Sequence, residues 1–78
     1  MDAKYEKMLD DFISSIIYLD ESPFNPNARK IKSYNKCFQK ASDGLLADQD
    51  GREALALLLK HDEPVVRFTA AFFLANRN

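Results

Sequence analysis

The chain has 78 residues, of which 46% are hydrophobic and 29% are charged, and its formal net charge is −1. This composition excludes an intrinsically disordered chain, and the length fits one folded domain, residues 1–78. No apolar run approaches the roughly 18 residues of a membrane span, and residues 1–6 do not begin a signal peptide. We therefore expect a cytoplasmic protein without a membrane partner.

Charge is distributed in blocks along the chain. Residues 1–22 carry six acids and two bases, residues 29–40 carry five bases and no acid, and residues 43–78 carry six acids and four bases. Such blocks predict either that the basic segment neutralises its acidic neighbours or that it presents a basic face to a partner.

The first apolar pattern predicts a helix over residues 3–18. Hydrophobic side chains recur there at steps of three and four residues, at Tyr5, Met8, Leu9, Phe12, Ile13, Ile16 and Ile17. Residues 20–27 contain two prolines and two asparagines, which cannot continue the helix and form the first linker. We expect Phe24 of this linker to close the edge of the core.

A second helix is predicted over residues 27–46, with Cys37 half-buried at the margin of its apolar face. The chain has one cysteine, which excludes an internal disulfide. The apolar face consists of Ile31, Tyr34, Phe38, Ala41 and Leu45. The opposite face carries a basic stripe within about 80° on an ideal helix, made of Arg29, Lys32, Lys36 and Lys40. Two interpretations stay open: a solvated face partly paired with acids of the first helix, or a nucleic-acid-binding face.

The acidic segment 48–53 has some features of a calcium-binding loop. The first and twelfth ligand positions of that loop would both be leucines, which cannot coordinate a hard cation. We instead predict a helix over residues 51–60 that is capped by Asp50, with Glu53 reaching back to complete a capping box.

The segment that follows predicts a helix end, a tight turn and a new helix. Lys60 and His61 suit the negative end of a helix dipole, and Asp62 and Glu63 precede Pro64, which is well tolerated at a first helical position. The last helix is therefore predicted over residues 64–75. One of its faces should pack on the preceding helix and contains Val66, Thr69, Ala70, Phe73 and Leu74. The other side carries Val65, Phe68 and Phe72.

Several of these residues together resemble the second half of a HEAT repeat. The matching positions are Leu58, Leu59, His61, Pro64, Val66, Arg67, Ala70, Ala71 and Leu74. The chain is most similar, over residues 51–75, to a small bacterial HEAT-like family of uncharacterised domains. This resemblance implies an all-α fold of four helices in two antiparallel hairpins, a HEAT-like right-handed α-solenoid fragment. HEAT patterns usually carry an Asp at the position of His61, so here we expect Asp62 or a carboxylate of a neighbouring hairpin to pair with Arg67.

No pattern in the chain predicts catalysis, a metal site or a cofactor. His61 is the only histidine, no cysteine lies within ligand spacing of it, and Gly44 and Gly51 are isolated rather than part of a phosphate loop. We therefore expect a protein that is not an enzyme and that binds no cofactor.

The expected function is a non-catalytic protein–protein interaction module. The resemblance implies that it is an immunity protein that neutralises a cognate bacterial toxin, and its acidic blocks would attract a basic nuclease toxin. A second copy of the chain, docked through the last helix, is the other expected partner. The predicted partner-binding residues are Val65, Phe68, Phe72, Asp48, Asp50, Asp62 and Glu63. The alternative function is nucleic-acid binding through the basic stripe, and the near-neutral total charge is an argument against it.

Overall fold

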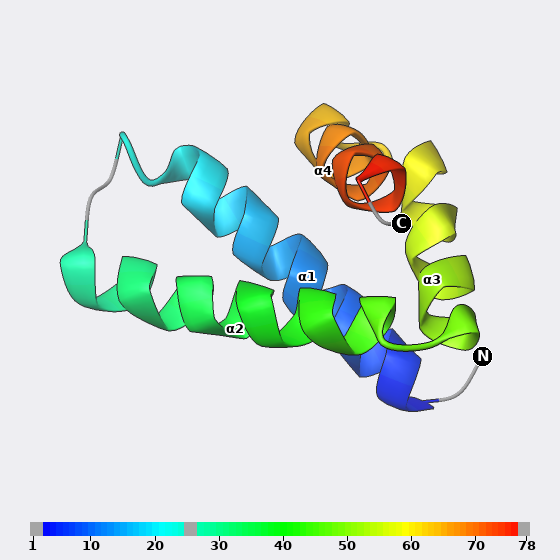
Figure 1. Cartoon of the computed structure of the whole chain (residues 1–78). Helices are drawn as coiled ribbons and strands as arrows, with labels where there is room; N and C mark the ends of the chain where they lie inside the picture. The colour runs from blue at the N-terminus through cyan, green and yellow to red at the C-terminus, as the bar shows by residue number, and fades with distance from the viewer. Residues whose placement is uncertain (1–2, 25–26, 77–78) are drawn as a thin grey trace.

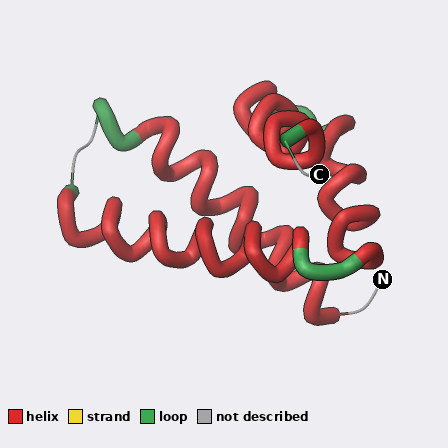
Figure 2. Tube along the Cα trace, in the orientation of Figure 1, coloured by secondary structure: helices red, strands yellow, loops and turns green. Residues whose placement is uncertain are grey.

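The computed structural model describes residues 3–24 and 27–76. They form four α-helices: α1 (Ala3–Glu21), α2 (Ala28–Leu46), α3 (Gln49–Ala56) and α4 (Pro64–Ala75), and a 3-10 turn, η1 (Leu57–Lys60), continues α3. No described residue belongs to a strand (Figure 2). The all-α, four-helix prediction is therefore confirmed, and the expected loop residues Asn25 and Pro26 lie outside the described residues.

The first two helices have ends that local chemistry explains. α1 continues one turn beyond the predicted residue 18, and Ser22 then donates its hydroxyl to the Leu19 carbonyl at 2.8 Å. Pro23 follows and cannot extend the helical ladder. α2 starts after Asn27, whose side-chain oxygen accepts the Lys30 N–H at 3.1 Å and so caps the helix.

The start of α3 differs from the prediction. Asp48, not Asp50, is the N-cap residue, because its Oδ1 accepts the Gly51 N–H at 2.8 Å. Glu53 does not complete a capping box, since its carboxylate accepts a hydrogen bond from the Gln49 amide. An N-cap Asp accepts a hydrogen bond from the backbone N–H three residues later, and Asp48 meets this rule as well as Asp50 does. The helix therefore begins two residues earlier than expected.

Gly51 allows α2 and α3 to approach closely. It is buried, and a Cβ built on it would lie 2.9 Å from the Leu45 carbonyl carbon and nearer still to the carbonyl oxygen. The glycine therefore fixes how tightly the chain folds back after α2, and no larger residue fits without moving the backbone.

The helices are arranged as a long hairpin with a shorter unit at one end. α1 and α2 pack antiparallel, while α3 and α4 lie near the end of the hairpin where α2 passes into α3 (Figure 1). In that view α4 is seen nearly along its axis, whereas α3 runs across the view. The second pair therefore crosses rather than forming the expected antiparallel hairpin, since η1 and the turn at 61–63 redirect the chain.

Phe12 lies at the centre of the core. It is fully buried, and its ring centroid is 5.2 Å from that of Phe38 and 5.9 Å from that of Phe73. The rings of α1, α2 and α4 thus meet in one cluster. The other buried apolar residues come from all four helices and η1: Tyr5, Leu9, Ile16, Ala41, Leu45, Ala54, Leu55, Leu58, Val66 and Ala70.

The half of the α1–α2 hairpin that lies toward the turn between these helices is more exposed than predicted. Tyr18 and Tyr34 stack there with ring centroids 4.2 Å apart, and both stay half-buried. Phe24 is 88% exposed, so its expected position at the core edge is wrong. The physical reason is that the tip of the hairpin projects beyond α3 and α4 (Figure 1).

Candidate interaction surface

The exposed side of α4 is apolar along its whole length. Phe68 is 70% exposed and Phe72 is 62% exposed. Pro64, Ala71 and Ala75 are exposed on the same side, since all five residues fall within about 100° on an ideal helix. We call these five residues the α4 outer face. The sequence interpretation found the two phenylalanines but missed the other three, although their spacing from Phe68 already placed them beside it.

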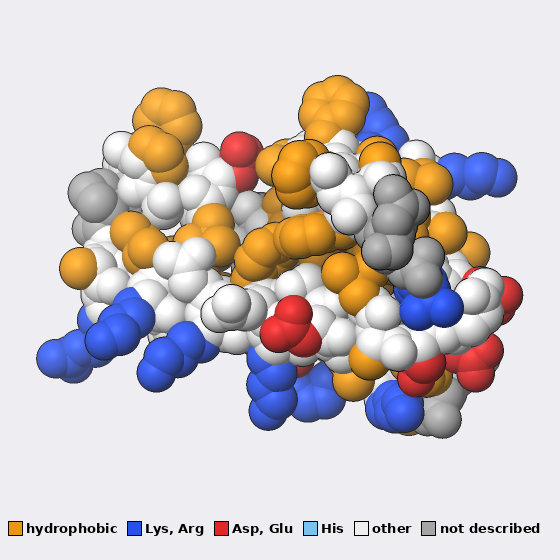
Figure 3. All heavy atoms as spheres, viewed as in Figure 1, with side chains coloured by type: hydrophobic (Ala, Val, Ile, Leu, Met, Phe, Trp, Pro, Cys, Tyr) orange, Lys and Arg blue, Asp and Glu red, His pale blue; other side chains and the backbone are white. Residues whose placement is uncertain are grey.

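No charge interrupts the α4 outer face. Arg67 is the only charged residue within α4, and its side chain turns back toward the preceding turn. Hydrophobic atoms cover much of the surface over α4 in the space-filling view (Figure 3). Extended apolar patches of this kind mark contact sites in small proteins.

Val65 does not belong to this face. It is half-buried and packs against the core, and with Ile16, Leu19 and Thr69 it lines a shallow pocket between α1 and α4. Its assignment to the exposed partner-binding side is therefore wrong. The reason is that α1 as well as α3 packs against α4, so two sides of α4 face the core.

Arg67 stabilises the turn between η1 and α4. Its Nη1 donates to the His61 carbonyl at 2.7 Å and to the Asp62 carbonyl at 3.2 Å. The expected ion pair with the Asp62 carboxylate is absent, and the arginine instead binds two backbone carbonyls of the turn between η1 and α4. His61 is part of the same turn, because its Nδ1 accepts the Glu63 N–H at 3.0 Å.

Asp48 connects the start of α3 to α1. The Tyr5 hydroxyl donates to its Oδ2 at 2.8 Å, while Oδ1 holds the Gly51 N–H. The hydrogen bond from the Gly51 N–H, followed by that from Tyr5, lowers the pKa of Asp48. The hydrogen bond from the Tyr5 hydroxyl to Asp48 raises the pKa of Tyr5. Asp48 is thus committed to a structural role.

The remaining predicted acids are exposed but do not form one patch. Asp50 lies in the first turn of α3, whereas Asp62 and Glu63 precede α4 after η1 has ended. The seven predicted partner-binding residues are therefore divided: Phe68 and Phe72 lie on the α4 outer face, and the three acids lie at two other places. Val65 packs against the core, and Asp48 is exposed but accepts hydrogen bonds from Tyr5 and Gly51.

The basic stripe on α2 is solvent-exposed. Arg29, Lys32, Lys36 and Lys40 are all exposed, and none of them forms an ion pair with a described residue. Blue atoms line the edge of the molecule along α2 (Figure 3). This exposure fits both interpretations of the stripe, whereas the expected pairing with acids of α1 does not occur within the described chain.

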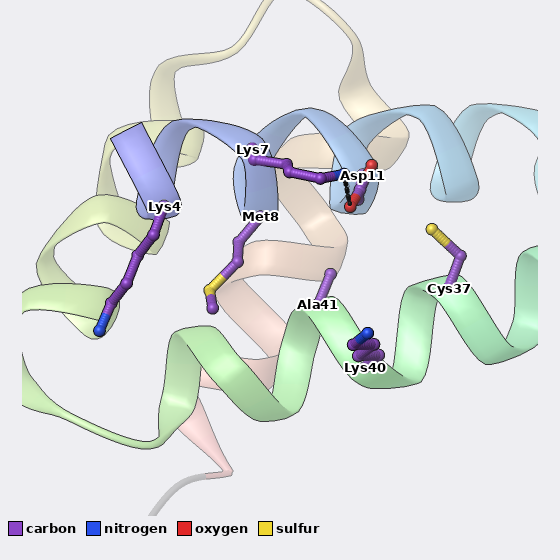
Figure 4. A pocket seen from close by; sticks show the side chains of 7 residues that line it. All are labelled: Lys4, Lys7, Met8, Asp11, Cys37, Lys40 and Ala41. Carbon is purple, nitrogen blue, oxygen red and sulfur yellow. Dashed lines mark hydrogen bonds and ion pairs between the residues drawn. The ribbon is translucent and has the colours of Figure 1, made fainter. Parts of the chain in front are cut away.

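A pocket lies between α1 and α2 on the side of this stripe. Its volume is about 240 Å³, and Figure 4 shows the side chains that line it: Lys4, Lys7, Met8, Asp11, Cys37, Lys40 and Ala41. Lys7 is paired with Asp11 at 3.3 Å. Cys37 is half-buried, as expected.

A second hollow follows the aromatic cluster between α2 and α4. Phe38 and Phe73 line it, with ring centroids 5.5 Å apart, together with Asp43 at its edge. The backbones of α2 and α4 make no close approach, so these two rings bridge the helices. The sequence placed both rings on apolar faces but gave no sign that they meet.

No three His, Cys, Asp or Glu side chains in 3–24 and 27–76 lie close enough to hold a metal ion. Within the same residues, none of the helices combines the length and apolar character needed to cross a bilayer. Comparison with protein-family models, curated proteins and solved structures finds no match to this chain.

Proposed function

We propose that this protein is a non-catalytic protein–protein interaction module that binds its partner through the α4 outer face. The observation that supports this most directly is the exposure of Phe68 and Phe72, four residues apart on a helix side without charge. Aromatic side chains with this exposure are the type that dominates binding energy at protein interfaces.

The energetic argument follows from how much of each ring is in water. Fully burying a phenylalanine is worth about 1.5–3 kcal/mol, so covering the exposed 70% of Phe68 and 62% of Phe72 would contribute about 2–4 kcal/mol. A small domain has a total stability of only about 4–12 kcal/mol. A partner that covers this face therefore gains a free energy that is large on the scale of the fold.

The test replaces each ring with a charge. Phe68→Glu and Phe72→Glu should keep the helical circular dichroism spectrum, because neither ring is in the core, and should abolish retention of the partner on the immobilised protein. Phe24→Glu is the matched control, since it makes the same change at a phenylalanine that is 88% exposed far from α4. Equal binding by all three variants would contradict the proposed function. Unfolding of the α4 variants would show instead that these rings belong to the core.

The finer proposal is a HEAT-like solenoid unit that acts as an immunity protein. Its support is the resemblance over residues 51–75 and the exposed acids Asp50, Asp62 and Glu63, which would speed encounter with a basic toxin. If this holds, a basic nuclease toxin should bind faster at low salt, and Asp62→Lys with Glu63→Lys should slow association. An association rate that does not depend on salt or on these acids would contradict it.

Nucleic-acid binding is the second candidate function. One observation favours it: Arg29, Lys32, Lys36 and Lys40 follow one side of α2 and are free of ion pairs with described residues. A phosphate-binding surface predicts affinity for a fluorescent oligonucleotide that falls steeply with salt. Lys36→Glu should then weaken binding, whereas Phe68→Glu should not. Absence of binding at low salt would exclude this candidate.

A further inference from the structure

We propose that the partner of the α4 outer face anchors itself by an arginine side chain in the hollow between α2 and α4. The inference rests on the proposed function of that face and names the chemistry of its partner. The hollow has a volume of about 440 Å³, within the roughly 300–1,000 Å³ of small-ligand sites. Its aromatic rings, its unpaired oxygens and its charge each favour a guanidinium group.

The hollow has an aromatic wall. Phe38 of α2 and Phe73 of α4 line it, and their ring planes are inclined at 44° to each other. Both residues are half-buried, so part of each side chain stays open to the hollow. A guanidinium group is planar and weakly hydrated, and it stacks on aromatic faces more readily than an ammonium group does. The rings therefore favour arginine over lysine as the occupant.

The α2 side of the hollow offers hydrogen-bond acceptors that the chain itself does not use. Asn35, Gln39 and Asp43 line the hollow and follow one another at intervals of four residues along α2. Each lies about 6 Å along the helix axis from the next. All three are exposed, and none of these side chains makes a hydrogen bond or ion pair with a described residue. Arginine carries five N–H donors in one plane, which suits several oxygens placed along a line.

The charge in the hollow selects a cation. Asp43 is the only charged side chain among the described residues that line it. Lys36 and Lys40 of the basic stripe lie on the same helix but do not line the hollow. An anion would be repelled by the Asp43 carboxylate, and an apolar group would cover the two amides without pairing them. A bidentate contact between a guanidinium and this carboxylate satisfies both groups.

The hollow continues into the α4 outer face. Phe72 belongs to that face, and its ring meets the ring of Phe73 edge-on, with centroids 5.8 Å apart. Hydrophobic atoms extend from the surface over α4 toward α2 (Figure 3). A partner that covers Phe72 can therefore place a neighbouring side chain in the hollow. Arginine is one of the residue types that carry most of the binding energy at protein interfaces.

An NMR titration with a blocked arginine, N-acetyl-arginine methylamide, tests the hollow by itself. The side-chain amide signals of Asn35 and Gln39 should shift and saturate, with a dissociation constant on the order of 1 mM for so small a ligand. The matched citrulline compound has the same shape without the charge and should bind at least about tenfold more weakly. The matched lysine compound should also bind more weakly, because it lacks the planar fork. Equal binding by either control compound would overturn the guanidinium assignment.

Asp43→Asn tests the charge at an exposed position that makes no hydrogen bond within the described chain. It should weaken binding of the blocked arginine at least about fivefold. Glu21→Gln is the matched control, since it removes the charge of an exposed acid at the end of α1, and it should leave this binding unchanged. Binding that Asp43→Asn leaves unchanged would overturn the proposal.

Peptides selected on the immobilised wild-type protein from a random phage-displayed library separate this inference from the proposed function. The inference predicts that the peptides share an arginine beside apolar residues, and that Asp43→Asn and Phe68→Glu each weaken their binding. Weakening by Phe68→Glu alone overturns the arginine anchor and leaves the α4 outer face as the binding site. Weakening by Asp43→Asn alone contradicts the proposed function of the α4 outer face and supports the arginine site in the hollow.

Discussion

Replacement of Gly51 by alanine is the sharpest test of how this chain folds back on itself after α2. The added Cβ would lie 2.9 Å from the Leu45 carbonyl carbon, whereas ordinary van der Waals contact begins at 3.4 Å. The clash involves backbone, which cannot rotate away as a side chain can. The start of α3 must therefore move by at least about half an ångström, and the hydrogen bond from the Gly51 N–H to Asp48 must stretch or break.

The magnitude follows from the cost of overpacking. Inserting one carbon into a closely packed site costs about 1–3 kcal/mol, and the better helix propensity of alanine recovers less than about 1 kcal/mol of it. For a domain of this size, each kcal/mol lowers the melting temperature by about 4–8 °C. We expect Gly51→Ala to melt about 5–15 °C below the wild-type chain at equal protein concentration.

Gly44→Ala is the matched control for this variant. Its Cβ would also be crowded, at 2.8 Å from Met8 Cε and 2.9 Å from Met8 Sδ, but these atoms are the flexible end of a side chain. Met8 can change rotamer, and alanine gains up to about 1 kcal/mol over glycine inside a helix. Thermal unfolding followed by circular dichroism should show little loss or a small gain. A Gly51→Ala melting temperature equal to that of Gly44→Ala would refute the argument.

Three further predictions concern the core, the turn and the cap. Phe12→Ala should lower the free energy of unfolding by about 3–5 kcal/mol, measured by urea titration, because it empties the centre of the aromatic cluster; a loss under about 1 kcal/mol would contradict this packing. Arg67→Ala should cost about 1–2 kcal/mol through two lost hydrogen bonds while partner binding persists; an unchanged melting temperature together with lost binding would reverse its structural assignment. The pKa of Asp48 is lowered from its ordinary 3.8, so the unfolded chain binds the proton more readily and this carboxylate stabilises the fold above pH 4, an effect lost as the pH falls further. Asp48→Asn keeps a capping oxygen and should flatten the acid limb of a melting-temperature profile; a slope identical to the wild type would exclude that linkage.

Local patterns predicted most of the helices correctly. Apolar periodicity and turn residues placed four helices, because a helix end depends on caps and prolines within a few positions of it. Pro64 illustrates this point, since it stands at the predicted and observed start of α4. The sequence predicts Asp50 as the cap of α3, whereas the structure has Asp48. Both acids satisfy the local rule for an N-cap, and only the folded chain shows which of them accepts the backbone N–H.

The sequence by itself determined that the chain is all-helical and that Phe68 and Phe72 lie on a different side of α4 from its buried residues. Only the tertiary structure decided which apolar residues remain in water, because exposure depends on where distant helices pack. Val65 became half-buried when α1 approached α4, and Phe24 stayed exposed since the tip of the hairpin projects beyond α3 and α4. The close approach at Gly51 likewise joins residues of two helices, and a helical pattern carries no information about the distance between helices.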